Sequence, residues 1–157
     1  QRLLKWTKTN TVNGQPYVYP FKYKLGRDNN VNNPLEHYLM LRLGETFLIR
    51  AEAKAQNSDL AGALADLNRI RNRAGLANSM AVTKEDILKD IFHERQIELF
   101  CECGHRWNDL RRTNMIDGVM TIVAPSKGTT WDLNYKLWPI PQLEINLNPL
   151  LAQNPGY

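Results

Sequence analysis

The chain has 157 residues, 43% hydrophobic and 23% charged, which is the composition of a globular protein rather than a disordered one. No apolar run approaches the ~20 residues that a membrane-spanning helix needs. The net charge of +4 would permit contact with nucleic acid, but the basic residues are dispersed and predict a solvated face instead. Because the chain starts at Gln1 without an initiator Met or a leader, we expect it to be either processed or cut from a longer protein.

The first 38 residues are rich in asparagine, and aromatic side chains recur there at every second position: Tyr17, Tyr19, Phe21 and Tyr23. This period predicts an extended segment with one aromatic face, and Pro16 and Pro20 confine it to the edge of a sheet. We expect the face to pack on a core rather than to stack on sugar rings. Residues 27–34 are predicted to form a polar turn, because Asn33 stands where a calcium loop needs glycine.

Residues 39–114 carry the apolar period of helices. A first helix is predicted around residues 41–55 and a second over residues 60–74, with Ser58 or Asp59 as its N-cap. Such an antiparallel pair has about the length of one tetratricopeptide repeat, ~34 residues. One pair cannot bury both of its apolar faces, so partner helices must lie elsewhere in this chain or outside it.

A third helix is predicted to start at Thr83, whose side chain can cap it in a pattern that is completed by Asp86. The inner face of this third helix begins with aliphatic residues and continues with charged ones. A fourth helix is predicted after Gly104. Because buried charges must be paired, we predict one structural ionic cluster that consists of Arg95, Glu98, Arg106 and Asp109.

The alternative interpretation makes Glu98 a catalytic base. The chain offers little else for catalysis: His93-Glu94 begins like a zinc-protease motif, but Ile97 occupies the position of the second histidine. The sequence also contains no phosphate-binding glycine loop, nucleophile elbow or Cys-x-x-Cys pair. We therefore predict no enzymatic activity, no metal site and no cofactor.

Residues 115–157 contain four closely spaced prolines in their second half and are predicted to be irregular, with a tail that wraps the helices. Residues 131–138 could hold a short hairpin or a loop. Trp131 and Tyr135 lie in this segment and are the best candidates for ligand binding, because irregular backbone can display their rings. We expect Trp138 to anchor the tail and Trp107 to lie in the core.

Two segments of the chain resemble the C-terminal part of the SusD/RagB family. One is HERQIELFCECGHRWNDLRRTN, residues 93–114, and the other is LWPIPQLEINLNPLLAQNPGY, residues 137–157. Residues 41–56, LRLGETFLIRAEAKAQ, resemble the family's repeat-like helix. The chain departs from the family pattern at Asn108, where an aromatic residue is usual, and at Cys103, which separates a glutamate and a glycine that are often adjacent.

The resemblance implies an all-α fold in which antiparallel tetratricopeptide-like helix pairs support extended, irregular N- and C-terminal segments, with a short β-hairpin as an allowed addition. Residues 1–157 would form a single C-terminal domain of a longer protein. Within it we expect an extended aromatic segment over residues 1–38, helices over residues 39–114 and an irregular tail over residues 115–157.

The resemblance also implies a function: non-enzymatic capture of a nutrient, most readily a glycan, on the outer membrane at the cell surface of Bacteroidetes-type bacteria. The implied partners are a TonB-dependent, SusC-like transporter and an oligosaccharide or other nutrient, without nucleic acid. Membrane contact would come only through a lipid anchor outside this chain. No ligand-binding residue is carried over by the resemblance. The alternative function is that of a helical-repeat adaptor that binds protein partners.

Overall fold

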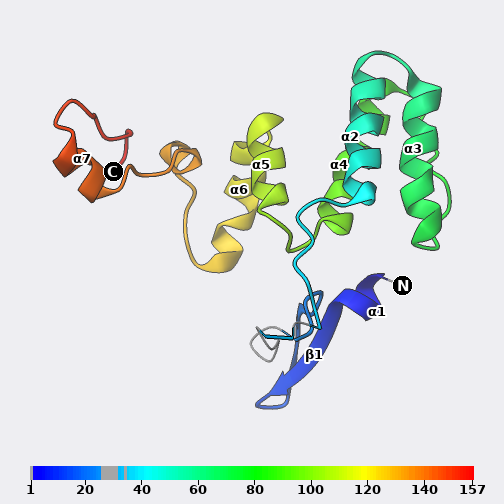
Figure 1. The fold of residues 1–157 in the computed structure, drawn as a ribbon, viewed down its shortest axis with the longest axis horizontal. Coiled ribbons are helices and arrows are strands. Elements are labelled where there is room, and N and C mark those ends of the chain that lie inside the picture. Colours follow the sequence, from blue (N-terminus) through cyan, green and yellow to red (C-terminus); the bar gives the residue numbers. More distant parts are fainter. Residues whose placement is uncertain (1, 26–31, 34) are drawn as a thin grey trace. The chain divides into compact units, whose positions relative to one another are not determined.

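The computed structural model describes residues 2–25, 32–33 and 35–157, so most of the predicted turn at residues 27–34 lies outside the described residues. The chain divides into two compact units, residues 1–106 and residues 107–157. Helices dominate the described chain and one small hairpin accompanies them, which confirms the predicted all-α class (Figure 1). None of the helices in the described residues is both long enough and apolar enough to cross a membrane.

The first unit begins with a short helix and a β-hairpin. Helix α1 spans Arg2–Trp6, and strands β1, Thr7–Val12, and β2, Gln15–Pro20, pair in antiparallel fashion. An Asn13-Gly14 turn joins the strands, and both of its residues have positive φ, as the favoured two-residue hairpin turn requires. The hairpin therefore lies here and not at residues 131–138.

The aromatic alternation predicted an extended segment, and the structure places only its first part in β2. The strand ends at Pro20, because proline cannot donate a ladder hydrogen bond and the chain bends after it. Tyr17 and Tyr19 are exposed, so the expected packing of these two rings on a core is wrong for the described structure. Farther along, Tyr23 stacks on Tyr38 with 4.4 Å between the ring centroids.

Three helices form the core of the first unit: α2, Leu43–Gln56, α3, Leu60–Arg73, and α4, Lys84–Glu98. Helices α2 and α3 are the predicted antiparallel pair, and α4 packs against both of them as a partner helix (Figure 1). The apolar stripes of the three helices meet in one buried cluster of Leu48, Ala51, Ala55, Ala63, Leu67, Ile70, Ile87 and Ile91. The small alanines allow close approach of the helices.

The ends of these helices follow the predicted capping residues. Asp59 caps α3 by accepting a hydrogen bond from the Gly62 amide at 2.9 Å. Gly75, with φ of +76°, follows the end of the same helix in the left-handed conformation. At the start of α4, the Thr83 hydroxyl accepts from the Asp86 amide at 3.1 Å and donates to the Asp86 carboxylate at 2.8 Å.

Short helices make up the second unit, with helix α5, His105–Arg112, crossing into it from the first. Its other elements are α6, Ile116–Val123, the 3-10 turns η2, Pro125–Lys127, and η3, Leu133–Lys136, and α7, Gln142–Leu147. Near the C-terminus, Gly156 has φ of +91°, the left-handed value that the third position of a type II turn over residues 154–157 requires.

The structure contradicts one expectation for this region and decides between the two alternatives given for residues 131–138. Residues 116–123 form a helix where irregular structure was expected, because burial of Ile116 and Ala124 outweighs the poor helix propensity of the glycine and β-branched residues between them. Residues 131–138 form no hairpin, because the Asp132 side chain accepts from the Asn134 amide at 2.7 Å and starts the 3-10 turn η3 instead.

We predict that Thr83→Ala lowers the free energy of unfolding by about 1 kcal/mol, because α4 then loses its side-chain N-cap. Thr83→Ser keeps the hydroxyl and should retain most of the stability. Urea unfolding followed by circular dichroism measures both variants against the parent chain. An alanine variant as stable as the serine variant would contradict the capping role.

Candidate functional site

Three glutamates near the C-terminal half of α4 are buried. Glu94 and Glu98 are 0% exposed, and Glu102, in the turn that follows the helix, is 6% exposed. Their spacing of four residues places the two helical members on the same face of α4. Carboxylates with so little access to water need charged or hydrogen-bonding partners.

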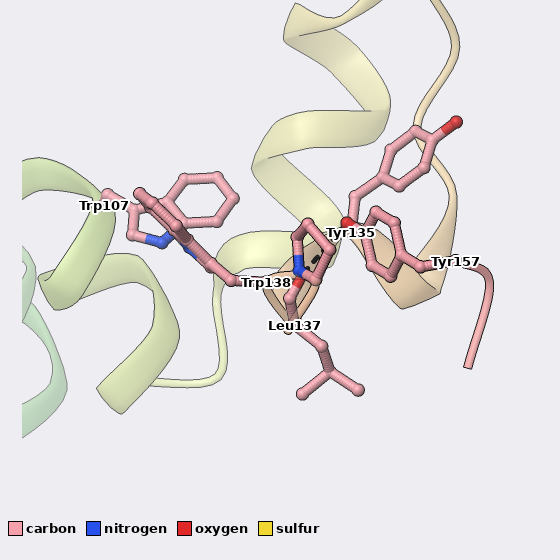
Figure 2. Close-up of a pocket in the computed structure, with 6 residues that line it drawn as sticks. Trp107, Tyr135, Leu137, Trp138 and Tyr157 are labelled. Carbon is pink, nitrogen blue, oxygen red and sulfur yellow. Dashed lines mark hydrogen bonds between the residues drawn. The ribbon is translucent and has the colours of Figure 1, made fainter. Parts of the chain in front are cut away.

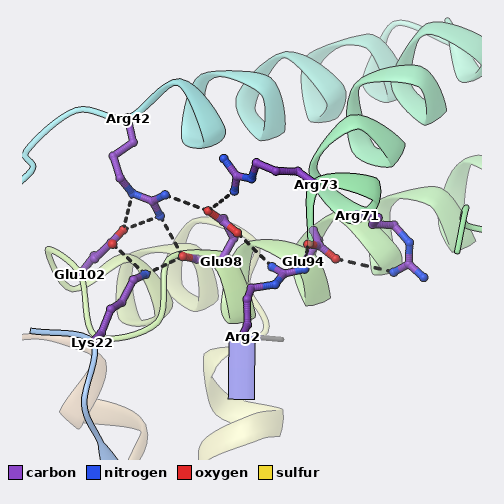
Figure 3. Close-up of polar contacts among 8 residues, drawn as sticks. All are labelled: Arg2, Lys22, Arg42, Arg71, Arg73, Glu94, Glu98 and Glu102. Atoms are coloured by element: carbon purple, nitrogen blue, oxygen red, sulfur yellow. Dashed lines mark hydrogen bonds and ion pairs between the residues drawn. The ribbon is translucent and has the colours of Figure 1, made fainter. Parts of the chain in front are cut away.

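Glu98 is held by three arginines that come from three different segments (Figure 3). Arg2 of α1 binds Oε2 at 3.0 Å, and Arg42, directly before α2, binds Oε1 at 2.8 Å. Arg73, the last residue of α3, also reaches Oε1, at 2.5 Å. The carboxylate therefore ties α4 to α1 and to the adjacent ends of α2 and α3.

The neighbouring glutamates extend this contact into a network. Arg42 also binds Glu102 at 2.7 Å, and Lys22 binds both the Glu102 carboxylate and the backbone carbonyl of Glu98, each at 2.7 Å. On the other side, Arg2 also contacts Glu94 at 2.5 Å, and Arg71 lies 3.6 Å from the second oxygen of Glu94. We call these eight residues the ionic network: Arg2, Lys22, Arg42, Arg71, Arg73, Glu94, Glu98 and Glu102.

The protonation of the network follows from its contacts. Burial raises the pKa of Glu98, but hydrogen bonds from Arg42 and Arg73 outweigh that effect and hold the pKa below its ordinary value. Burial lowers the pKa of Lys22, although Glu102 favours its charged form. A general base at neutral pH needs a free carboxylate with a raised pKa. Glu98 has the opposite properties, which argues against its role as a catalytic base.

The predicted ionic cluster overlaps this network only at Glu98. Arg95 is buried, as predicted, and Asp109 is buried and pairs with Arg112 at 2.8 Å. The single cluster of Arg95, Glu98, Arg106 and Asp109 stays a prediction. The sequence patterns did not reveal Arg2 or the other partners of Glu98. One signal was available: Glu94, Glu98 and Glu102 follow one another at intervals of four residues, and three carboxylates on one face need several cations.

The second predicted site lies in the second unit. Trp131 makes edge-to-face contacts with Trp107 and with Tyr135, at centroid distances of 6.1 Å and 5.9 Å. Its indole nitrogen donates to Asp117 at 3.0 Å, and the same carboxylate binds Lys136 at 3.2 Å. The structure thus brings the two candidate residues, Trp131 and Tyr135, into direct contact and fixes the orientation of the tryptophan.

An open cavity of about 240 Å³ lies beside these rings, and its lining is almost entirely apolar (Figure 2). Tyr135, Trp138 and Tyr157 line it with exposed fractions of 45%, 68% and 49%. The Tyr157 hydroxyl donates to the Leu137 carbonyl at 3.0 Å and fixes one side. We call this group the aromatic cavity; its lining residues are Trp107, Tyr135, Leu137, Trp138, Pro139 and Tyr157.

Two tryptophans differ from their expected roles. Trp138 was expected to anchor the tail, and its backbone carbonyl accepts from Asn154 at 2.6 Å, but its ring is exposed and lines the aromatic cavity. Trp107 was expected in the core and is half-buried at the cavity. Its indole nitrogen is shielded from water and has no hydrogen-bond partner within the described residues.

We predict that Glu98→Ala lowers the free energy of unfolding by about 3–5 kcal/mol, because three arginines lose a buried partner. Glu85→Ala, at an exposed position in the first turn of the same helix, serves as the control and should cost less than about 1 kcal/mol. Thermal and urea unfolding measure the difference. A Glu98→Ala variant that is folded and equally stable, but binds no ligand, would show that the role is functional instead.

We also predict that the stability of the chain falls at acidic pH. The folded-state pKa of Glu98 is lowered, so its contribution is complete above the ordinary glutamate pKa, about 4.3, and is lost as pH falls through the folded value. Urea unfolding at a series of pH values between about 7 and about 3 should show this decline. The decline should be smaller in Glu98→Gln, and equal slopes in the two proteins would contradict the assignment.

Comparisons with known proteins agree with this fold. The family model described as the SusD family matches residues 5–157. The chain is 32% identical over 124 residues to the starch-binding protein SusD of Bacteroides thetaiotaomicron, covering 75% of this chain and 21% of that protein. It is 31% identical over 128 residues to SusD-like protein P38 of Formosa agariphila, covering 76% of this chain and 24% of the relative.

Solved structures show the same likeness. The surface glycan-binding protein A from Bacteroides uniformis has a TM-score of 0.76 and 27% identity, covering 98% of this chain and 37% of that one. A SusD superfamily protein from Parabacteroides distasonis has a TM-score of 0.68 and 26% identity, covering 90% and 32%. The chain spans between about a fifth and a third of the length of the curated relatives it matches. Since the family model covers nearly the whole sequence, the chain belongs to the SusD family.

Proposed function

We propose that this chain is the C-terminal part of a non-enzymatic, cell-surface protein that binds a nutrient, most readily a glycan. Family membership supports the proposal, and so do the relatives described as a starch-binding protein and a surface glycan-binding protein. The observation that carries it in this chain is the aromatic cavity of the second unit. The repeat-like helix pair alone would also suit a protein-binding adaptor, but family membership favours nutrient binding.

Sugar rings present apolar C–H faces, which pack on aromatic rings, and hydroxyl groups, which need hydrogen-bond partners. The aromatic cavity offers exposed rings from Tyr135, Trp138 and Tyr157 for the first requirement. Trp131 lies next to this surface and braces Tyr135 through its edge-to-face contact. In this proposal Tyr135 contacts the sugar. Trp131 holds the ring of Tyr135 in position and extends the aromatic surface.

The cavity meets the second requirement only in part. Its lining is nearly all apolar, and Trp107 contributes the one buried indole N–H that has no partner among the described residues. A complete sugar site combines aromatic faces with several placed polar groups. We therefore infer that the remaining donors and acceptors come from parts of the longer protein that match the rest of its relatives.

The same proposal includes the partner and the location. The longer protein would be held by a lipid anchor at the outer membrane, facing the cell exterior. There it would work with a TonB-dependent, SusC-like transporter, to which it delivers the captured oligosaccharide. Co-purification of the longer protein with an outer-membrane transporter from the native cells tests this part of the proposal.

We predict that this chain binds a neutral glycan only weakly by itself and that the longer protein binds the same glycan more tightly. Calorimetric titration of both with one glycan library measures the two affinities. Tyr135→Ala and Trp138→Ala should each weaken the residual binding of this chain roughly tenfold, since each removes an exposed stacking surface.

Tyr17→Ala provides the matched control, because it removes an exposed aromatic ring from the hairpin of the first unit. It should leave the affinity unchanged. Equal affinities in this chain and the longer protein would contradict the inferred incompleteness of the site. Unchanged binding in both Tyr135→Ala and Trp138→Ala would remove the site from the aromatic cavity.

A further inference from the structure

A second cavity, of about 320 Å³, lies in the first unit beside the ionic network. Its volume is at the low end of the range for small-ligand sites, about 300–1,000 Å³. The lining combines four cationic side chains, one carboxylate, one indole and one small residue: Arg2, Lys5, Trp6, Arg42, Arg73, Ala74 and Glu98. We call it the cationic cavity.

Positive charge exceeds negative charge throughout this region. The ionic network has five cationic side chains and three carboxylates, and Lys5 adds another cation at the cavity. The helix termini do not offset the excess, because the negative C-terminal end of α3 and the positive N-terminal end of α2 both reach the lining, at Ala74 and Arg42. Cations gathered in a concave site raise the local concentration of anions.

The buried and the exposed cations of the cavity differ in how many carboxylates they bind. Arg2 and Arg42 each bind two carboxylates, and their side chains are only 11% and 17% exposed. Arg73 is 54% exposed and forms one ion pair within the described residues, to Glu98, which leaves most of its five N–H donors open. Lys5 is exposed and forms no ion pair or hydrogen bond with any described residue.

We propose that the cationic cavity binds an acidic sugar unit, one that carries a carboxylate or a sulfate group. The planar guanidinium of Arg73 and the ammonium of Lys5 would bind the anionic group, since both act as donors to such oxygens. Trp6, which lines the same cavity, would supply an apolar surface for the sugar ring. This inference rests on the proposed glycan-binding function and adds a substrate class to it.

The four tryptophans of the chain provide the test, because their indole N–H signals in a proton–nitrogen correlation spectrum report on separate places. Trp6 lines the cationic cavity, whereas Trp107 and Trp138 line the aromatic cavity. The chain is titrated with a disaccharide that contains glucuronic acid, with a sulfated disaccharide and with the neutral parent of each. Millimolar affinities are within reach of this measurement.

Both acidic sugars, or one of them, should shift the Trp6 signal, and the neutral parents should leave it in place. The sugar that shifts the Trp6 signal identifies the anionic group, a carboxylate or a sulfate. Lys5→Gln and Arg73→Gln should each weaken this binding roughly tenfold, because a charged hydrogen bond is lost, and added salt should weaken it further. Arg73→Lys keeps the charge and should retain most of the affinity. Lys89→Gln removes an exposed charge in the N-terminal half of α4, away from Glu98, and serves as the control.

An unmoved Trp6 signal with both acidic sugars overturns the inference, as does binding that is equal for charged and neutral sugars. Full retention of binding in both Lys5→Gln and Arg73→Gln does the same. Failure of the proposed function is a different result: neutral glycans would then leave the Trp107 and Trp138 signals unmoved. Thermal unfolding of each variant confirms that any loss of binding occurs in a folded chain.

Discussion

The first unit depends on one buried carboxylate. Glu98 has no exposed surface, and an ion in that position is tolerated only with charged partners in place. Its three arginines come from α1, from the residue before α2 and from the last residue of α3. The apolar cluster can hold α2, α3 and α4 together, but α1 buries no residue completely. The ion pairs of Arg2 therefore do much to hold α1 against the helices.

The same constraint explains a glycine in the first turn of α2. A Cβ atom at Gly44 would lie 3.3 Å from Oε1 of Glu98 and 3.5 Å from the guanidinium nitrogens of Arg73. Glycine costs a helix up to about 1 kcal/mol relative to alanine. The close approach offsets this cost by placing the carboxylate near the N-terminal end of α2, where the helix dipole favours negative charge. The apolar period alone predicts a helix that includes Gly44 and gives no reason for a glycine there.

Local patterns in the sequence were sufficient for α2, α3 and α4, whereas α1 lies in a segment that was expected to be extended. The bounds of α2 and α3 follow from the apolar period, and Thr83 and Asp59 cap the helices that they precede. Helix α6 was missed because β-branched residues and a glycine give it little local signal. A short hairpin was expected as an addition to the fold, but its place was missed because its first strand is almost wholly polar, although its Asn-Gly turn was readable.

Long-range pairing was the part of the site that sequence could not supply. A charged position on an apolar helix face correctly marked Glu98 as buried, but Arg2 lies 96 residues away from it in the chain. Any of the 20 basic residues could have been the partner on the basis of charge alone. Aromatic residues in irregular segments were easier to interpret, because Trp131 and Tyr135 are four residues apart and meet through local chain geometry.

In the proposed anion site, one set of charges would serve both structure and recognition. Its central carboxylate is saturated, so Arg2 and Arg42 are committed to the fold and would be difficult to replace. At the edge, Arg73 is half-exposed with donors to spare, and removing one partner still leaves Glu98 with two arginines. Edge positions can therefore change during evolution without loss of the core contacts. A change of charge at Arg73 would therefore alter the proposed anion site while the buried contacts of Glu98 with Arg2 and Arg42 stay in place.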